Sequence, residues 1–379
     1  MHFKVAKKQL LDGLNIVSRA VSLNSPLPSL HGILLVVKED YIQLTASDLD
    51  ISIQVKIVNS EDSKLEVAET GDIILDSKYI LDMIRKIDSD EVEVEIIDGL
   101  LTKISGASVN FEINGIKAEN YPLIDFSKPE NTFYLKSDEL KELISQTCFA
   151  TSDKETRPVL TGLNLKAENG EMKCVATDSY RLAQKIMYME DNDSFNITIP
   201  AKSLNEVAKV LNNDEEIEIS ISDKKVLFSM ENVLIQTRLI EGSYPETSRL
   251  IPQNFNYELV VDARDILSAI DRASFIKNEG VSIIKMDISA SEIVITSRSS
   301  EVGSVETITP VSYVGDNLSI SFKGQYVYEA IRALNAFQIK IQFDMLCGPV
   351  VFRIEQYFAD LFIERKGLRT DIQFPVLHP

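Results

Sequence analysis

The chain repeats one pattern three times, and this repetition limits the folds open to it more than any other feature. In each copy a strand-like stretch runs into an amphipathic helix, and the stretches begin at Phe3, Phe133 and Leu259. An apolar residue follows seven positions after each start, at Leu10, Leu140 and Ile266. A second unit, a short strand followed by a lysine and a helix, recurs around Lys78, Lys202 and Lys323. Because these lysines are 124 and 121 residues apart, each repeat is a whole domain and not a solenoid unit of roughly 20–50 residues.

Length and composition agree with three domains of ordinary size. The 379 residues correspond to roughly two to four domains, and the 44% of hydrophobic residues are enough for a core in each. Two segments, residues 120–131 and 242–254, both contain a Tyr-Pro pair and resemble connectors. We therefore predict an N-terminal domain at 1–125, a central domain at 128–252 and a C-terminal domain at 254–379.

Between the helices, apolar and polar residues alternate with a period of two, which is typical of half-buried strands. Such stretches start at Val92, Ile217 and Ile339, and the first contains the turn pairs Asp-Gly and Asn-Gly. Each domain is therefore expected to hold two helices and two groups of antiparallel strands, an α+β fold.

Motifs for catalysis, cofactors and metals are missing from the sequence. It contains no HExxH, GxSxG, Walker A or GxGxxG pattern, and its three histidines are scattered. Asp178 and Arg181, in ATDSYRLA, suggest an acid–base pair, but no nucleophile or metal ligand is near them. A salt bridge or capped turn is the better interpretation of this motif. We expect no intrinsic enzyme activity, no cofactor and no metal site.

The same inspection favours the cytoplasm. Cys148, Cys174 and Cys347 have no CxxC spacing, as expected for free thiols in a reducing compartment. No apolar run reaches the roughly 18–20 residues of a membrane span, and the N-terminus lacks the apolar core of a signal peptide.

Charge is distributed unevenly along the chain. The net charge is −19, which by itself argues against a nucleic-acid binder. The six predicted helices, however, hold 16 basic and 12 acidic residues; their limits are 4–20, 76–88, 136–148, 201–210, 262–277 and 322–335. Lysines decorate any solvated helix face, which is one interpretation. The alternative is that all six helices line a single surface that accepts a polyanion while the rest of the chain repels it.

Several stretches resemble the bacterial beta sliding clamps, the beta subunits of DNA polymerase III. The resemblance covers essentially the whole chain; it rests on LPSLHGILL (27–35), TASDLDISI (45–53), RPVLTGLNL (157–165), VATDSYRLA (175–183), EGSYPETSRLIP (241–252) and QFPV (373–376). The family fold has three α+β domains per chain and closes head-to-tail into a dimeric ring around DNA. The resemblance therefore implies a clamp that tethers the replicative polymerase and confers processivity.

Helix spacing independently favours two chains per ring. Two helices per domain, roughly 10 Å apart, would leave roughly 9 Å of clear space inside a ring of three domains. That space is narrower than the roughly 12 Å major groove alone. Six domains leave roughly 28 Å, so two chains can encircle a duplex and one cannot.

The residues expected to face the DNA come from two sources. The resemblance implies Lys202 and Lys154. The repeat adds cations on the other helices: Lys78, Arg85, Lys209, Lys323 and Arg332. The family often has an arginine near position 24, where this chain has Asn24, and aromatic contacts of some members are replaced by Pro158 and Val159.

The resemblance also implies a pocket, between the central and last domains, for short linear peptides of partner proteins. Those partners are the replicative polymerase catalytic subunit, the clamp loader, repair polymerases and ligase. The matching residues are Leu160, Thr177, Tyr180, Arg181, Leu182, Pro245, Arg249, Leu250, Ile372, Phe374, Pro375 and Val376. Ser179 replaces a common glycine, and the chain ends VLHP where the family commonly has an arginine.

Dimer contacts are expected at opposite ends of the chain. In the family, an edge strand of the first domain pairs with one of the third domain in the second copy. The matching residues are Phe111 and Ile113 on one side and Phe275 and Ile276 on the other. The family also implies a bacterial cytoplasmic location near the nucleoid.

Two other functions stay open at this point. One is a scaffold protein of the same architecture that does not clamp DNA, and the other is a hydrolase with an unrecognised site. A DNA association that resists salt and survives on circular but not linear DNA would separate a clamp from both.

Overall fold

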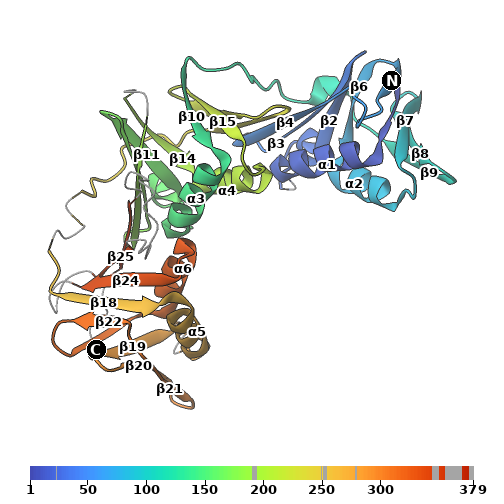
Figure 1. Cartoon of the computed structure of the whole chain (residues 1–379). Helices are drawn as coiled ribbons and strands as arrows, with labels where there is room; N and C mark the ends of the chain where they lie inside the picture. The colour runs from blue at the N-terminus through green and yellow to red at the C-terminus, as the bar shows by residue number, and fades with distance from the viewer. Residues whose placement is uncertain are drawn as a thin grey trace. The chain divides into compact units, whose positions relative to one another are not determined.

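The structure is a computed structural model that describes residues 1–22, 24–189, 194–248, 250, 254–277, 280–343, 350–354 and 369–374, the last two stretches as backbone only (Figure 1). The chain divides into two compact units. Unit 1 is Met1–Asp138 with Glu206–Leu239, and unit 2 is Glu139–Asn205 with Ile240–Pro379.

Unit 1 contains two antiparallel sheets and the helices α1 (Lys7–Val17) and α2 (Ser77–Lys86). The five-stranded sheet has the order β5-β1-β7-β8-β9, and the eight-stranded sheet has the order β10-β15-β16-β17-β4-β3-β2-β6. The strands are β1 (His2–Ala6), β2 (Gly32–Val37), β3 (Tyr41–Ser47), β4 (Ile51–Val58), β5 (Glu66–Glu69), β6 (Gly71–Asp76), β7 (Glu91–Asp98), β8 (Leu101–Gly106), β9 (Val109–Asn114), β10 (Asn131–Lys136), β15 (Glu216–Ile221), β16 (Lys225–Ser229) and β17 (Val233–Arg238).

Unit 2 contains a nine-stranded sheet, β14-β11-β12-β13-β26-β25-β24-β18-β22, and a four-stranded sheet, β21-β20-β19-β23. Its helices are α5 (Ala263–Ser274) and α6 (Gly324–Leu334), while α3 (Ser137–Thr147) and α4 (Ala201–Val210) cross the limit between the units. The strands are β11 (Gly162–Glu168), β12 (Glu171–Thr177), β13 (Leu182–Tyr188), β14 (Phe195–Pro200), β18 (Tyr257–Asp262), β19 (Ile283–Ile288), β20 (Ile293–Arg298), β21 (Gly303–Ile308), β22 (Ser312–Val314), β23 (Leu318–Lys323), β24 (Gln338–Phe343), β25 (Val350–Ile354) and β26 (Arg369–Phe374).

The threefold repeat is confirmed strand by strand. One group of four strands is ordered β1-β7-β8-β9, β10-β15-β16-β17 and β18-β24-β25-β26 in successive repeats. The other is ordered β6-β2-β3-β4, β14-β11-β12-β13 and β23-β19-β20-β21. Each repeat also has two helices, and the apolar residues predicted to mark the first helix, Leu10, Leu140 and Ile266, are all buried. The predicted α+β fold is therefore correct.

Consecutive repeats share their sheets. Strand β4 of the first repeat pairs with β17 of the second, from Ile51 opposite Thr237 to Val55 opposite Val233. Strand β13 of the second pairs with β26 of the third. Both sheets run across a domain boundary, so the division of the chain into two units falls within the central domain, and each unit holds one complete junction.

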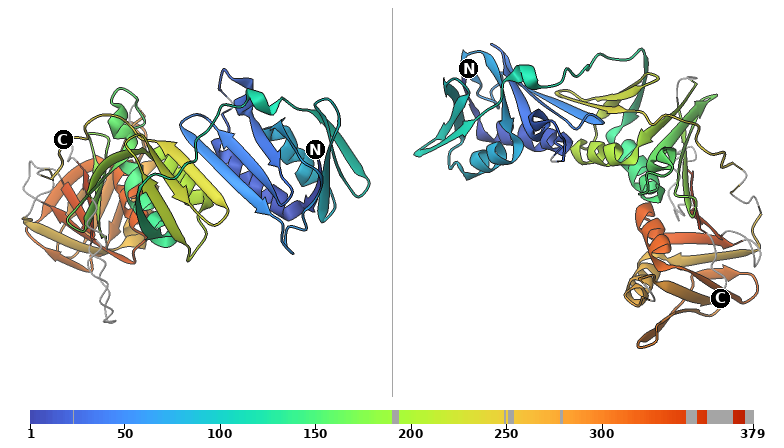
Figure 2. Two further views of the ribbon diagram at one scale, coloured as in Figure 1. Left: turned by 90° about the horizontal axis from the view of Figure 1, so that it is seen from above. Right: turned by 180° about the vertical axis from the view of Figure 1, so that it is seen from behind.

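The helices are fixed to their sheets by apolar faces and by capped ends. Leu10, Leu14 and Val17 of α1 are fully buried, and this helix packs on β3 and β4 (Figure 2). The Asp76 carboxylate accepts hydrogen bonds from the backbone N–H groups of two residues in the first turn of α2, which satisfies donors that a helix start leaves free.

The predicted unit of strand, lysine and helix is present in all three repeats, but its lysine takes a different position in the third. Lys78 and Lys202 are the second residues of α2 and α4, but Lys323 lies just before α6, whose second residue is Gln325. The third repeat starts its helix one residue after the lysine, so this lysine occupies the cap position.

None of the helices in the described ranges is long and apolar enough to cross a membrane.

Candidate functional site

Four of the predicted DNA-facing cations are exposed and unpaired. Lys78 on α2, Lys202 on α4 and Arg332 on α6 are exposed, and so is Lys154 in the loop after α3. Their side chains form no ion pair with any residue that the structure describes. These cations are available to a polyanion.

The other three predicted cations have partners within the chain. Arg85 lies 3.8 Å from Asp82, and the Lys209 Nζ lies 2.7 Å from Glu206, each on the same helix. The Lys323 Nζ lies 4.4 Å from the centre of a tyrosine ring on α6. These contacts reduce the charge that the three side chains can offer to a phosphate.

The ATDSYRLA motif forms the tight turn between β12 and β13. The Asp178 Oδ1 accepts hydrogen bonds from the backbone N–H groups of Tyr180 and Arg181, both at 2.8 Å. The Thr177 Oγ1 donates to the Arg181 carbonyl at 2.6 Å, and Ser179 takes a left-handed φ of 76°. The capped turn expected from the sequence is confirmed, and the Asp178 carboxylate is the group that caps it.

Several contacts hold the side chain of Arg181, one of the predicted pocket residues, in place. Its guanidinium lies 4.7 Å from the centre of the Tyr326 ring and 5.4 Å from that of the Phe149 ring. Nη1 donates to the Glu329 carboxylate, Nη2 donates to the Phe149 carbonyl, and Nε donates to Asp178 at 3.2 Å. This side chain therefore joins the central repeat to α6 of the third repeat.

Leu182 and Leu160, two further predicted pocket residues, are buried. Leu182 packs with Val175 against Tyr244 and Phe255. The Tyr244 hydroxyl accepts a hydrogen bond from the backbone N–H of Thr177 at 3.0 Å, and burial raises the pKa of this tyrosine above its usual value. These contacts form a firm apolar wall.

The remaining pocket residues lie at the surface or outside the described ranges. Tyr180 is 65% exposed, and Pro245 and Leu250 are also exposed. The backbone of β26 runs along β13, with Gln373 opposite Leu182. Ile372 and Phe374 are described as backbone only, and Arg249, Pro375 and Val376 lie outside the described residues. The predicted assembly of the twelve residues stays a proposal.

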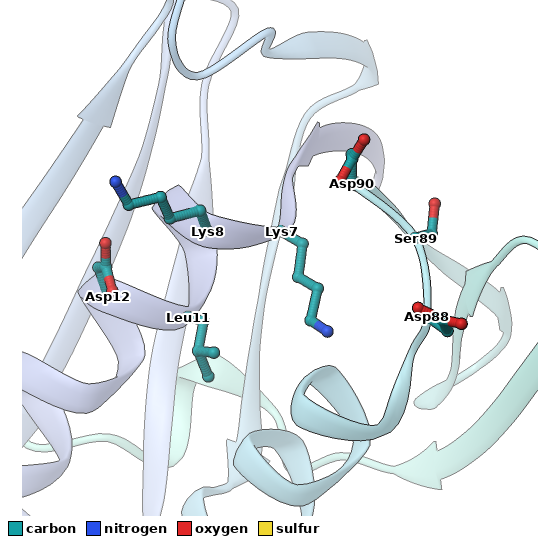
Figure 3. A pocket seen from close by; sticks show the side chains of 7 residues that line it. All are labelled: Lys7, Lys8, Leu11, Asp12, Asp88, Ser89 and Asp90. Carbon is teal, nitrogen blue, oxygen red and sulfur yellow. The ribbon is translucent and has the colours of Figure 1, made fainter.

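A depression of about 540 Å³ in unit 1 has a structural explanation (Figure 3). It lies between the start of α1 and residues 88–90, and Lys7 points into it. The Lys7 Nζ donates to the carbonyls of Arg85 and Ile87 at the end of α2. A cation at a helix C-terminus stabilises the free carbonyls there, so this lysine is a helix cap.

The described thiols are also structural. Cys148 and Cys174 are buried and free, and burial raises the pKa of Cys148 to about 12. Such thiols stay protonated at neutral pH and are poor nucleophiles. Cys347 lies outside the described residues. Among the residues whose placement is described, no three His, Cys, Asp or Glu side chains are grouped to hold a metal ion.

Comparison with known proteins gives one family for all three domains. Models of the DNA polymerase III beta subunit match its N-terminal domain at residues 1–125, central domain at 134–246 and C-terminal domain at 248–356. The beta sliding clamp of Bacillus subtilis is 37% identical over 361 residues, which cover 93% of this chain and 96% of that protein. That of Staphylococcus aureus (strain N315) is 34% identical over 359 residues, covering 93% and 95%. The chain belongs to the beta sliding clamp family.

A solved structure supports this at the level of the fold. The DNA polymerase sliding clamp from Bacillus subtilis matches with a TM-score of 0.91 at 34% identity, covering 100% of this chain and 99% of that one. A beta subunit from Streptococcus pyogenes gives the same TM-score at 28% identity, with 100% of both chains covered. The chain therefore has the clamp fold, and it is a DNA sliding clamp of DNA polymerase III.

The residues predicted to join two clamps differ in exposure. Phe275, at the end of α5, is 68% exposed, whereas Ile276 is buried within its own domain. On β9, Phe111 is half-buried and Ile113 is buried. Phe275 therefore offers a second clamp the largest apolar surface of the four.

Sequence reasoning missed three residues around Arg181: Phe149, Tyr326 and Glu329. A signal was present, because the sixth residue of each second helix is an acid: Asp82, Glu206 and Glu329. Only the structure shows that arginines from elsewhere in the chain meet two of these acids.

Proposed function

We propose that two copies of this chain close head-to-tail into a ring that encircles duplex DNA. The observation that carries the proposal is the pairing pattern of the repeats. In the first and second repeats, the second group of four strands ends on β4 and β13, and each of these edges pairs with the last strand of the next repeat, β17 and β26. In the described part of the chain, the equivalent strands β21 and β9 end their sheets.

The strand pairing between consecutive repeats indicates that these two edges can pair with each other. An exposed strand edge carries free N–H and C=O groups that favour pairing with another strand. Since β4 and β13 each accept a last strand of the neighbouring repeat, β21 of one copy is suited to β9 of the other. With the register of the β17–β4 pair, in which Ile235 lies opposite Ile53, Phe111 on β9 would lie opposite Ser304 on β21 of the second copy. Two such seams close a ring.

The DNA is held by topology and by a weak positive lining. Lys78, Lys154, Lys202 and Arg332 are the exposed cations of that lining, supplemented by Arg85, Lys209 and Lys323. Because several of these are partly neutralised within the chain, contacts with phosphates are weak and the ring slides. The strongly acidic remainder of the chain repels DNA from the outer surface.

The wall around Leu182 and Arg181 receives short peptides of partner proteins. Buried Leu160 and Leu182 supply an apolar floor, and exposed Tyr180, Pro245 and Leu250 supply a rim that an incoming peptide would cover. The partners proposed are the replicative polymerase, the clamp loader, repair polymerases and ligase. The clamp has no reaction of its own, and the ATP hydrolysis of loading belongs to the loader. It acts in the cytoplasm, at the nucleoid.

The test is retention on DNA of defined topology. We expect clamp loaded on a nicked circular plasmid to stay bound through gel filtration in high salt, and to be released when the plasmid is cut once. An electrostatic DNA binder would be lost in salt from both forms. Retention on linear DNA after the salt wash, or release from the circle, would overturn the ring.

A further inference from the structure

The acidic residue at the sixth position of the second helix of each repeat has a different partner in each repeat. Glu206 on α4 accepts a charged hydrogen bond from Arg19, which follows α1 of the preceding repeat, at 3.3 Å. Glu329 on α6 accepts one from Arg181 of the preceding repeat. Both pairs therefore cross a junction between two domains. Asp82 on α2 meets only Arg85 of its own helix among the described residues.

The junction around Arg181 is built from four positions. Phe149 is the thirteenth residue counted from the start of α3. Tyr326 and Glu329 are the third and sixth residues of α6. Arg181 is the last residue of the four-residue turn between β12 and β13, and it lies between the two rings with its charge on the glutamate.

Three of these four positions recur at the two ends of the chain. Counting thirteen residues from the start of α5 leads to Phe275 in the third repeat. The third and sixth residues of α2 in the first repeat are Tyr79 and Asp82. Phe275 is 68% exposed and Tyr79 is 57% exposed, although the aromatic side chains at both positions in the Arg181 junction are half-buried.

The fourth position carries no charge. The turn between β20 and β21 has four residues, and the Ser299 Oγ accepts from the backbone N–H groups of Glu301 and Val302 at 3.3 and 3.1 Å. Asp178 does the same for Tyr180 and Arg181. Val302, which is 48% exposed, is thus the equivalent of Arg181.

We propose that the seam between two copies of this clamp repeats the Arg181 junction with its arginine left out. Phe275 of one copy faces Tyr79 and Asp82 of the second copy, and Val302 stands where the junction inside the chain has a guanidinium. This inference rests on the ring dimer proposed above, and adds which residues meet there and why this junction differs from the other two.

The missing arginine explains how a ring of similar junctions can open at one kind of junction. Arg181 combines a carboxylate contact with two aromatic contacts in a position where its side chain is only 10% exposed. Cation–π contacts are stronger when they are removed from water, and a buried ion pair is costly to break because separation leaves an uncompensated charge. The seam keeps the aromatic and acidic members but lacks the side chain that would connect them. Each junction within the chain is held by an arginine–glutamate pair. The seam between two chains has no such pair, so it separates more easily.

The direct experiment restores the arginine. Val302→Arg should slow subunit exchange, measured by mixing clamps labelled with two fluorophores, on the order of tenfold. Asp82→Asn should cancel most of that gain in the double variant and change little alone. Val302→Met is the matched control, because it adds length without charge, and it should leave exchange near that of the unmodified clamp.

Several outcomes would overturn the proposal: unchanged or faster exchange in Val302→Arg, the same slowing in Val302→Met, or a gain that persists with Asp82→Asn. A chain that is monomeric before any substitution would instead reject the ring dimer itself.

A second measurement tests the contact without the added arginine. In a chain with Cys347→Ser, the pair Phe275→Cys and Tyr79→Cys should be joined by a short bis-maleimide into a covalent dimer. The matched pair Phe275→Cys and Val58→Cys, both at exposed positions, should not be joined. Failure of the first pair, in a chain that is dimeric by light scattering, would reject the placement of Phe275 against α2.

Discussion

Arg181 links the docking wall, the surface around Leu182 proposed to receive partner peptides, to the architecture of the clamp. Its contacts come from three segments: the turn that contains it, the end of α3 and the helix α6. Two of its five N–H groups are left for other partners. Holding a planar guanidinium between two rings removes most of its rotational freedom, so a peptide that uses it would lose little entropy on binding.

This leads to a prediction for Glu329. Glu329→Gln keeps the size of the side chain but removes the charge that holds Nη1, so Arg181 becomes less well ordered. We expect polymerase-derived peptides to bind about fivefold more weakly, which corresponds to about 1 kcal/mol. Fluorescence polarisation with a labelled peptide measures this.

Glu206→Gln is the matched control, because Glu206 occupies the same helix position at the other junction and accepts from Arg19 instead. It should leave peptide affinity unchanged. Equal weakening by both substitutions would mean that Glu329 acts on general stability and not on the docking wall.

At the scale of elements, side chains cap the ends of several helices. Asp76 and Asp262 cap the starts of α2 and α5 with their carboxylates. The end of α2 is held by Lys7, which reaches across from the first turn of α1. That contact ties the two helices of the first repeat together at one end (Figure 3).

Lys7→Met should therefore lower the free energy of unfolding of the clamp by about 1 kcal/mol, because the last carbonyls of α2 lose their cation. Urea denaturation followed by circular dichroism measures the midpoint. Lys8→Met is the control: Lys8 is adjacent, exposed and, within the described residues, in no ion pair, and Figure 3 shows it pointing away from Lys7. A midpoint shift of the same size for Lys8→Met would contradict the capping role.

The elements were largely predictable from the sequence, and the contacts between them were not. Periodicity located the helices, because each buries an apolar face and Leu10, Leu140 and Ile266 mark it. The position of Lys323 just before α6 was not predictable, since spacing alone cannot tell a cap lysine from a lysine inside the first turn. The pairs Arg19–Glu206 and Arg181–Glu329 join residues 187 and 148 positions apart, at different offsets in the repeat. No local pattern encodes such a meeting; it depends on how successive domains share a sheet.

At the scale of the whole molecule, the balance of charge decides how the clamp meets DNA. The chain carries −19, yet exposed, unpaired cations are found on α2, α4 and α6. Paired acids such as Asp82 and Glu206 moderate the same helices. In a ring the lining is therefore weakly positive, enough to accept DNA during loading but too weak to hold one register of phosphates.

The last prediction separates the lining from net charge. The triple variant Lys78→Gln, Lys202→Gln and Arg332→Gln changes the net charge from −19 to −22. The triple Lys38→Gln, Lys117→Gln and Lys224→Gln makes the same change at exposed positions outside the helices. Loader-dependent binding to nicked circular DNA at low salt should fall several-fold for the first triple and little for the second, since each lost phosphate contact weakens binding and its salt dependence.

Once loaded, both variants should stay on the circle as long as the unmodified clamp, because closure and not charge retains them. Equal losses from both triples would place the DNA contact outside the helices, and rapid loss of the first triple from circular DNA would mean that charge, and not the closed ring, holds the clamp in place.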